Sequence, residues 1–194
     1  MFKFVTRQQA KALKAEGHRA IDVSSWAAEP YQLLSPFYPH GNLPVPGMPG
    51  ETSDSFEGIW QGLKVFEGGG IDRSYFRGKG RKRRGGKVLG HQCGDRLLDY
   101  FEARRTIYIP GYRNMVLTTP AFAVARQLVE EALDGTDTFL HDFEANGDPN
   151  RHKPLAHASI LCALLQENLE VVQRYFADKN YRVQYLVGFL PYRG

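Results

Sequence analysis

The sequence has few of the features that mark secreted or membrane-spanning proteins. Its two cysteines, Cys93 and Cys162, lie far apart and have no second pair at metal-ligand spacing, which favours free thiols in a reducing compartment over a disulfide framework. No apolar run approaches the roughly 20 residues that a membrane-spanning helix needs. Residues 1–4 lack the apolar core of a secretory signal. A cytoplasmic protein without a membrane partner is therefore expected.

The short motifs of the common nucleotide-binding and hydrolytic folds are also missing. The chain contains no GxGxxG after a strand, no GxxxxGK[ST], no HExxH and no GxSxG. Its histidines are scattered, and no two of them lie four residues apart on one expected helix. The sequence therefore predicts neither a bound metal nor another cofactor.

Acidic residues are absent from one stretch, residues 73–87, which is rich in arginine, lysine and glycine. The whole chain has a net charge of +4, and this stretch supplies the surplus, so an anionic partner is expected. Glycines in such a loop let backbone amides reach a phosphate. The residues predicted to bind phosphate or nucleic acid are Arg77, Lys79, Arg81, Lys82, Arg83 and Arg84. The alternative is that the stretch is a solvated loop.

Length and periodicity predict a single α+β domain over residues 1–194, predominantly helical with a small sheet. The expected helices cover residues 8–16, 55–66, 94–105, 120–133 and 155–177, and the expected strands cover 19–24, 138–143 and 181–190. A turn is expected at Pro110–Gly111. Residues 30–50, rich in proline, form a long loop, and loops of this length are usually functional.

The expected helix over residues 55–66 carries the clearest candidate for chemistry. Its apolar residues fall on one helical face, and Glu57, Gln61 and Lys64 fall together beside that face. A carboxylate, an amide and an ammonium group are thus aligned along the margin of a buried stripe. Two structural alternatives stay open: Glu57 completes a capping box with Asp54, and Trp60 is a core residue.

Two segments, LSPFYPHG at residues 34–41 and SFEGIWQGLKVF at residues 55–66, resemble the NADAR superfamily. Members of that superfamily carry an FSNFYP-like segment followed by a helix with a glutamate, an aromatic–glutamine pair and a lysine. Nearly the whole chain is similar to the bacterial and phage family DUF6939, including GKVLGH at residues 86–91 and PLAHA at residues 154–158.

The resemblance to NADAR enzymes implies N-glycosidic bond cleavage, either in early riboflavin-pathway intermediates or between ADP-ribose and guanine. It implies that Glu57 is the catalytic helix glutamate and that Asp142 corresponds to a late acidic residue, although the tryptophan expected near Asp142 is missing. The residues assigned to substrate binding are Ser35, Phe37, Tyr38, Trp60, Gln61, Lys64, Lys87 and His91.

The function expected from these observations is an N-glycosidase-like hydrolase that acts on a ribosylated base, a nucleotide or ADP-ribosylated guanine. The partner would be a small molecule, with nucleic acid as a further partner of the basic stretch. An alternative is a non-catalytic module that binds a nucleotide or nucleic acid. A third hypothesis is a phage protein that sequesters a nucleotide signal in the same pocket. The sequence makes no prediction about oligomeric state.

Overall fold

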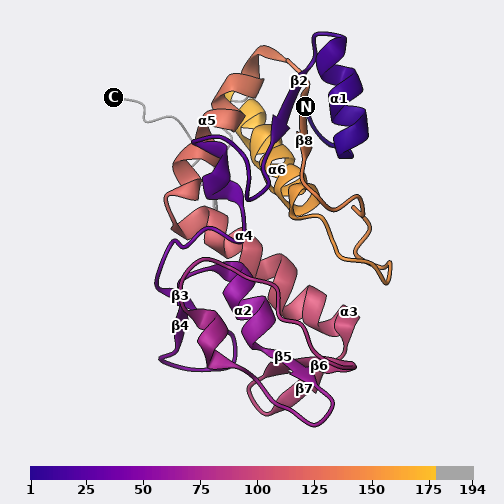
Figure 1. The fold of residues 1–194 in the computed structure, drawn as a ribbon. Helices are drawn as coiled ribbons and strands as arrows, with labels where there is room; N and C mark the ends of the chain where they lie inside the picture. Colours follow the sequence, from indigo (N-terminus) through magenta and orange to yellow (C-terminus); the bar gives the residue numbers. More distant parts are fainter. Residues whose placement is uncertain (178–194) are drawn as a thin grey trace.

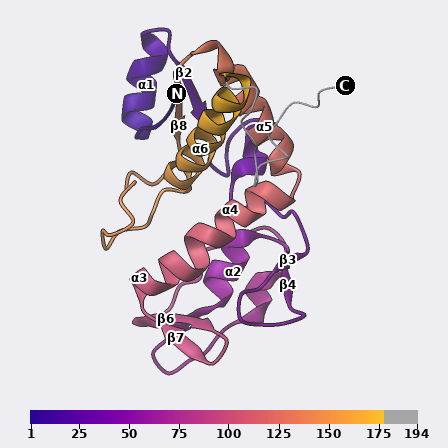
Figure 2. The ribbon, with the colours of Figure 1, turned by 180° about the vertical axis from the view of Figure 1, so that it is seen from behind.

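A computed structural model describes residues 1–177, which form an α+β fold with two regions bridged by a long helix (Figure 1). The first region contains a parallel sheet of β1 (Phe2–Phe4), β8 (Thr138–His141) and β2 (Arg19–Asp22), with β8 in the middle. The helix α1 (Arg7–Ala15) connects β1 to β2. The helix α6 (His157–Ala177) covers one face of this sheet (Figure 2).

The second region contains the antiparallel sheet of β5 (Lys64–Phe66), β6 (Val88–Cys93) and β7 (Arg96–Leu98). It also holds α2 (Phe56–Gly62), the short pair β3 (Leu43–Pro44) and β4 (Thr52–Ser53), and the 3₁₀ turn η2 (Arg73–Phe76). The 3₁₀ turn η1 (Tyr31–Leu34) packs instead against α5 (Ala121–Glu131). The bridging helix consists of α3 (Tyr100–Ala103), a π-helical turn (Arg104–Tyr108) and α4 (Ile109–Thr118), followed by α5 (Ala121–Glu131).

Local capping determines where several of the expected elements begin and end. Thr6 and Gln9 form a capping box at the start of α1, because each side chain accepts a hydrogen bond from the other residue's backbone amide. Gly135 follows the short 3₁₀ turn η4 (Ala132–Asp134) with a left-handed φ of 88° and stops the helical segment. The helix over 155–177 and the strand over 138–143 are present with slightly shorter bounds. The strand expected over 181–190 lies outside the described residues.

Several predictions of secondary structure are wrong. The helix expected over residues 55–66 ends at Gly62, and residues 64–66 form β5, because Val65 and Phe66 pair with β6 instead. Gly62 also allows Phe76 to approach, since a Cβ at this position would lie 2.3 Å from the ring of Phe76. The small sheet of the prediction is three small sheets in the structure.

The helix expected over residues 94–105 begins later, and the turn expected at Pro110–Gly111 does not exist. Gly94, with a φ of 58°, forms the turn between β6 and β7, and Asp99 caps the helix that starts at Tyr100. Pro110 lies in the first turn of α4 directly after the π-helical turn, where a proline without an N–H is tolerated. Gly111 continues the helix and lies against the ring of Phe56.

The hydrophobic core lies where α4, α5 and α6 pack together and extends to α2. Its fully buried members include Tyr112, Met115, Leu128, Leu161 and Leu165. Among the helices of residues 1–177, none has the length and apolar content that a membrane crossing would need.

Candidate functional site

A cavity of about 610 Å³ lies where the two regions meet. Its wall combines residues of α2, β6 and the π-helical turn with residues that follow β2 and β8. The volume falls in the range typical of small-molecule sites. The sequence-predicted residues on this wall are Phe37, Glu57, Trp60, Gln61, Lys64, Lys82, His91 and Asp142.

Glu57 lies in the first turn of α2, and its side chain is 4% exposed. Its backbone amide donates to the carbonyl of Pro36 at 2.7 Å, which joins α2 to the loop that carries Phe37. Ser55 caps the helix by accepting a hydrogen bond from the amide of Gly58. The alternative that Glu57 forms a capping box with Asp54 is therefore wrong, because Asp54 accepts from Gly78 instead and Glu57 lies on the cavity wall.

Burial raises the pKa of Glu57 from 4.5 to about 7. A hydrogen bond from Gln61 and the positive charges of Lys82 and Lys64 oppose this rise without cancelling it. Glu57 therefore exchanges a proton close to neutral pH, which is the range that a general base or acid requires.

Gln61 connects Glu57 to Lys64. Its amide nitrogen donates to Oε1 of Glu57 at 2.8 Å, and its Oε1 accepts from Nζ of Lys64 at 2.6 Å and from the backbone amide of Arg83 at 3.0 Å. The predicted alignment of the three side chains is present, although Lys64 lies at the start of β5 and not on the helix. Burial lowers the pKa of Lys64, which the negative charge of Glu57 partly opposes.

Trp60 and His91 stack on each other and form one aromatic wall. Their ring centroids are 3.7 Å apart, and Tyr108 packs edge-on against Trp60 at 5.0 Å. Burial, together with the charge of Lys64, lowers the pKa of His91 to about 3, so its imidazole is neutral. Neither ring nitrogen of His91 has a hydrogen-bond partner among residues 1–177. Trp60 is thus both a core residue, 9% exposed, and part of the cavity wall.

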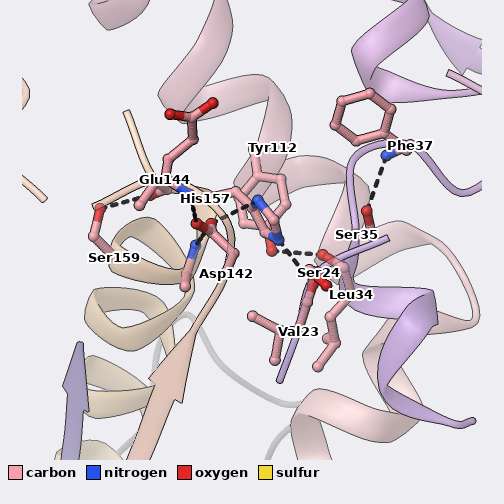
Figure 3. A network of polar contacts seen from close by, with 12 residues as sticks. Val23, Ser24, Leu34, Ser35, Phe37, Tyr112, Asp142, Glu144, His157 and Ser159 are labelled. Carbon is pink, nitrogen blue, oxygen red and sulfur yellow. Dashed lines mark hydrogen bonds and ion pairs between the residues drawn. The ribbon is translucent and has the colours of Figure 1, made fainter. Parts of the chain in front are cut away.

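Asp142 and His157 form a buried pair at the start of α6 (Figure 3). Nδ1 of His157 lies 2.9 Å from Oδ2 of Asp142, and Nε2 lies 2.8 Å from the carbonyl oxygen of Val23. Both nitrogens face acceptors, which favours the imidazolium. Asp142 also accepts from the backbone amides of Ala158 and Glu144. Most of its acceptor capacity is therefore used inside the protein.

These contacts determine the charges of the pair. Burial alone would raise the pKa of Asp142, but the charge of His157 and the hydrogen bonds hold this pKa below its usual value. Burial likewise opposes the imidazolium, but Asp142 and the carbonyl of Val23 raise the pKa of His157 above its usual value. Asp142 therefore positions the neighbouring chain, and its contacts do not favour the catalytic role expected from the sequence.

The basic stretch of residues 73–87 divides into residues with different contacts. Lys82 lines the cavity and forms an ion pair with Glu144 at 3.2 Å. Arg83 donates to the carbonyls of Lys64 and Gly70, so it holds the stretch against β5. The other residues predicted to bind phosphate or nucleic acid, which are Arg77, Lys79, Arg81 and Arg84, are exposed and lie outside the cavity wall.

Gly80 brings the basic stretch directly over Glu57. Its amide donates to the carbonyl of Phe37 at 2.9 Å. A Cβ at this position would lie 2.7 Å from Cβ of Glu57 and 2.9 Å from Cα of Phe37. A residue without a side chain is therefore needed here.

Three residues predicted to bind substrate are not part of the cavity wall. Ser35 is buried, and its Oγ accepts from the amide of Phe37 at 3.3 Å. Tyr38 packs against His40 instead of lining the cavity beside Phe37, because a turn closed by its amide and the carbonyl of Ser35 directs the two rings differently. Lys87 is exposed just before β6.

Other residues of the wall were missed at the sequence level. Arg104 and Tyr108 lie four residues apart on the π-helical turn and both line the cavity. The sequence predicted a helix that ends at residue 105, so it did not relate the two residues to each other. Arg104 is 1% exposed and donates to the carbonyls of Pro149, Arg151 and Lys153, so it fixes the loop before α6. The loop residues Trp26, Phe143, Glu144 and His152 of the wall were assigned no role from the sequence. His157, the first residue of α6, also lies on the wall; it belongs to the PLAHA segment but was assigned no role there.

The fold and the site define an α+β protein with an aromatic-walled cavity around a buried carboxylate. Within residues 1–177, no three His, Cys, Asp or Glu side chains gather as a metal site would require. The model of the family described as "Family of unknown function (DUF6939)" matches residues 5–161. The chain belongs to this family. Searches of the curated proteins and of the solved structures find no match.

Proposed function

We propose that this protein is an N-glycosidase that hydrolyses the bond between a ribose carbon and a base nitrogen, with Glu57 as its catalytic carboxylate. The observation that carries the proposal is the state of Glu57, which is almost fully buried on the wall of a cavity of about 610 Å³ and has a pKa near 7. A buried structural carboxylate normally pairs directly with a cation, whereas Glu57 accepts its hydrogen bond from the neutral amide of Gln61.

The resemblance to the NADAR superfamily supports the same assignment. The two segments that carry the resemblance, residues 34–41 and 55–66, are in direct contact through the hydrogen bond from Glu57 to Pro36. Both segments contribute to one cavity, through Phe37 on the first and through Glu57, Trp60, Gln61 and Lys64 on the second. On this proposal the fold is NADAR-like as well.

The chemistry follows from the groups on the wall. As the C–N bond breaks, positive charge develops on the ribose, and the ionised carboxylate of Glu57 stabilises it. The base leaves with the electrons of the broken bond, and water attacks the sugar carbon and gives a proton to Glu57. Glu57 then passes this proton to the departing base, which returns the carboxylate to its ionised form. Burial raises the pKa of Tyr108 well above 10, so its phenol stays protonated and is available to donate a hydrogen bond to the leaving base.

The cavity wall favours an anionic substrate with a planar base. Phe37, Trp60 and Tyr108 provide aromatic surfaces, and Lys64 and Lys82 provide positive charge. Nucleotides, ribosylated bases and ADP-ribosylated guanine share these properties. We therefore propose a small-molecule substrate of this class.

A screen for base release tests the proposal. The protein is incubated with a panel of nucleotides and ADP-ribosylated bases, and mass spectrometry measures the free base and the hydrolysed sugar. We expect release from at least one member, and a loss of about 10³-fold or more in Glu57→Gln. Glu67→Gln is the matched control, because Glu67 is an exposed glutamate next to β5. Equal release by both variants would reject the role of Glu57.

A second candidate function is binding without turnover, and the contacts of Asp142 favour it. The carboxylate of Asp142 is held by His157 and by two backbone amides, so it is not available to assist Glu57. A site with one available carboxylate can bind a nucleotide without hydrolysing it. Calorimetry that detects nucleotide binding, together with the absence of free base from every bound compound, would establish a binding module in place of an enzyme.

A further inference from the structure

Two exposed aromatic residues, Trp26 and Phe143, also border the cavity. In the sequence they lie far from the buried stack of Trp60 and His91. Trp26 is 82% exposed and Phe143 is 49% exposed. Their ring centroids are 6.2 Å apart in an edge-to-face arrangement. Both residues belong to the cavity wall. A tryptophan this exposed is uncommon in a folded protein, and exposed aromatic surface beside a cavity commonly marks a binding site.

The sheet and two tight turns hold this pair in place. Trp26 follows β2 and Phe143 follows β8, so both lie beyond the carboxyl ends of neighbouring parallel strands, where open α/β sheets bind ligands. The turn before Trp26 is closed by Asp22 and Ser24, whose side chains accept from the amides of Ser24 and Trp26. The turn at Phe143 is closed by the Asp142 carboxylate, which accepts from the amide of Glu144.

The charges around the pair indicate what would occupy it. The guanidinium carbon of Arg7 lies 4.6 Å from the ring centroid of Phe143, and Lys82 lies on the same cavity wall, where it pairs with Glu144. An edge-to-face pair offers one ring for stacking and the other for an edge contact. Flat aromatic surface flanked by cations is complementary to a planar ring that is linked to an anion. A nucleobase joined to phosphate has this chemistry.

We infer that Trp26 and Phe143 form a second base-binding subsite at the mouth of the cavity, separate from the aromatic wall beside Glu57. The inference rests on the proposed function. It narrows the substrate class to nucleotides with two bases, of which one is the ribosylated base that is released and the other is a second nucleobase. Trp26 stacks on that nucleobase, and the cationic groups hold the phosphate between the two ends.

The two tryptophans of the chain allow a direct test by fluorescence. Acrylamide quenches the emission of an exposed tryptophan, so the quenchable signal comes from Trp26 and not from Trp60, which is 9% exposed. Adenosine monophosphate is expected to protect Trp26 and lower the quenching constant about 2-fold or more. Ribose 5-phosphate, which has the phosphate and sugar but no base, is the control and should give no protection.

Affinity measurements on variants complete the test. Trp26→Ala should weaken the binding of adenosine monophosphate roughly 5- to 150-fold, and Trp26→Phe should restore most of it, because a base stacked on an aromatic ring contributes a free energy of that order. Leu117→Ala is the matched control, since Leu117 is 37% exposed on α4 and is not part of the cavity wall. Binding that is unaffected by Trp26→Ala would overturn the subsite.

Base release, measured on the same samples, separates this inference from the proposed function. Protection of Trp26 by the nucleotide without base release from any compound would support the subsite and overturn the glycosidase. Base release without protection, and without an effect of Trp26→Ala, would overturn the subsite and support the glycosidase. If neither protection nor base release is found, both are overturned.

Discussion

At the scale of single residues, the burial that raises the pKa of Glu57 makes its ionised form unfavourable in the folded protein. The folded-state pKa of about 7 lies above the ordinary value of 4.5, so the folded protein binds this proton more tightly than the unfolded chain does. The free energy of unfolding therefore falls as pH rises from about 4.5 to about 7, and Glu57 makes no further change above that range. On the proposed function, a catalytic group is retained here at a cost in stability.

The first prediction concerns the pH dependence of stability. Glu57→Gln removes the titrating group, so the variant should gain stability relative to the wild type between pH 5 and pH 8, by on the order of 2–3 kcal/mol. Urea denaturation of both proteins at the two pH values measures this difference. Parallel pH dependences in the two proteins would show that the carboxyl group of Glu57 is not buried in solution.

The second prediction assigns Asp142 a positioning role. Asp142→Asn leaves the His157 imidazolium without its counter-charge, which should lower the free energy of unfolding by roughly 3–5 kcal/mol. Thermal unfolding measures this loss, and Asp137→Asn is the control because Asp137 is an exposed acid that pairs with Lys3. Below its melting temperature, Asp142→Asn should retain base release within about 10-fold of the wild type. A stable variant without any base release would instead make Asp142 catalytic.

The candidate site was only partly predictable at this scale. The sequence could group Glu57, Gln61 and Lys64, because residues three and four positions apart lie on the same side of a helix. Tyr108 could not be placed, since it is the last residue of the π-helical turn, which changes the helical phase. Trp26 and Phe143 meet only because β2 and β8 are neighbours in the sheet, although the two residues are far apart in the sequence.

At the scale of elements, boundaries were predictable where a side chain caps a backbone group locally. The capping box of α1 and the glycine that follows η4 are examples. Long-range pairing was not predictable. Leu97 and Leu98 fit a helical pattern, but the hairpin of β6 and β7 pairs Leu98 with His91 and leaves Leu97 exposed. The short strand β1 has too few residues for a periodic pattern.

The third prediction concerns the close approach of the basic stretch to α2. Gly80→Ala places a methyl group against Cβ of Glu57 and the backbone of Phe37, so it should lower kcat/KM for base release about 10-fold or more without changing any functional group. Gly86→Ala is the control, because a Cβ at Gly86 meets nothing within 4 Å. Steady-state kinetics of the two variants gives the comparison, and equal kinetics would show that the segment is not packed on Glu57 in solution.

At the scale of the whole molecule, five cations of the basic stretch lie at two kinds of position. Lys82 lies on the cavity wall, whereas Arg77, Lys79, Arg81 and Arg84 are exposed outside it. A small nucleotide in the cavity would contact the first kind and a nucleic acid the second. The net charge of +4 alone does not separate these partners.

The fourth prediction separates them by substitution. Lys82→Gln should raise KM for a small nucleotide about 5-fold or more. Neutralising Arg77, Lys79, Arg81 and Arg84 together should change that KM by less than about 2-fold, since long-range charge is screened. If these four exposed residues bind nucleic acid, the same quadruple variant should bind it with a weaker salt dependence. The slope of log affinity against log salt concentration should fall by nearly one for each phosphate that the variant no longer neutralises. A large rise in KM in the quadruple variant would instead show that the exposed residues bind the phosphate of the small nucleotide.

The central claim, that Glu57 acts as an ionised carboxylate in N-glycosidic bond hydrolysis, is tested most directly by the pH profile of base release. Mass spectrometry would measure the initial rate of free-base formation from the best substrate between pH 5 and pH 8.5, for the wild type and for Glu57→Gln. We expect a wild-type rate that rises with pH and levels off above about 7, where Glu57 is ionised, and a plateau rate about 10³-fold or more lower for the variant, without a change near pH 7. Base release by Glu57→Gln at the wild-type rate, or a wild-type profile without a change near pH 7, would contradict the claim.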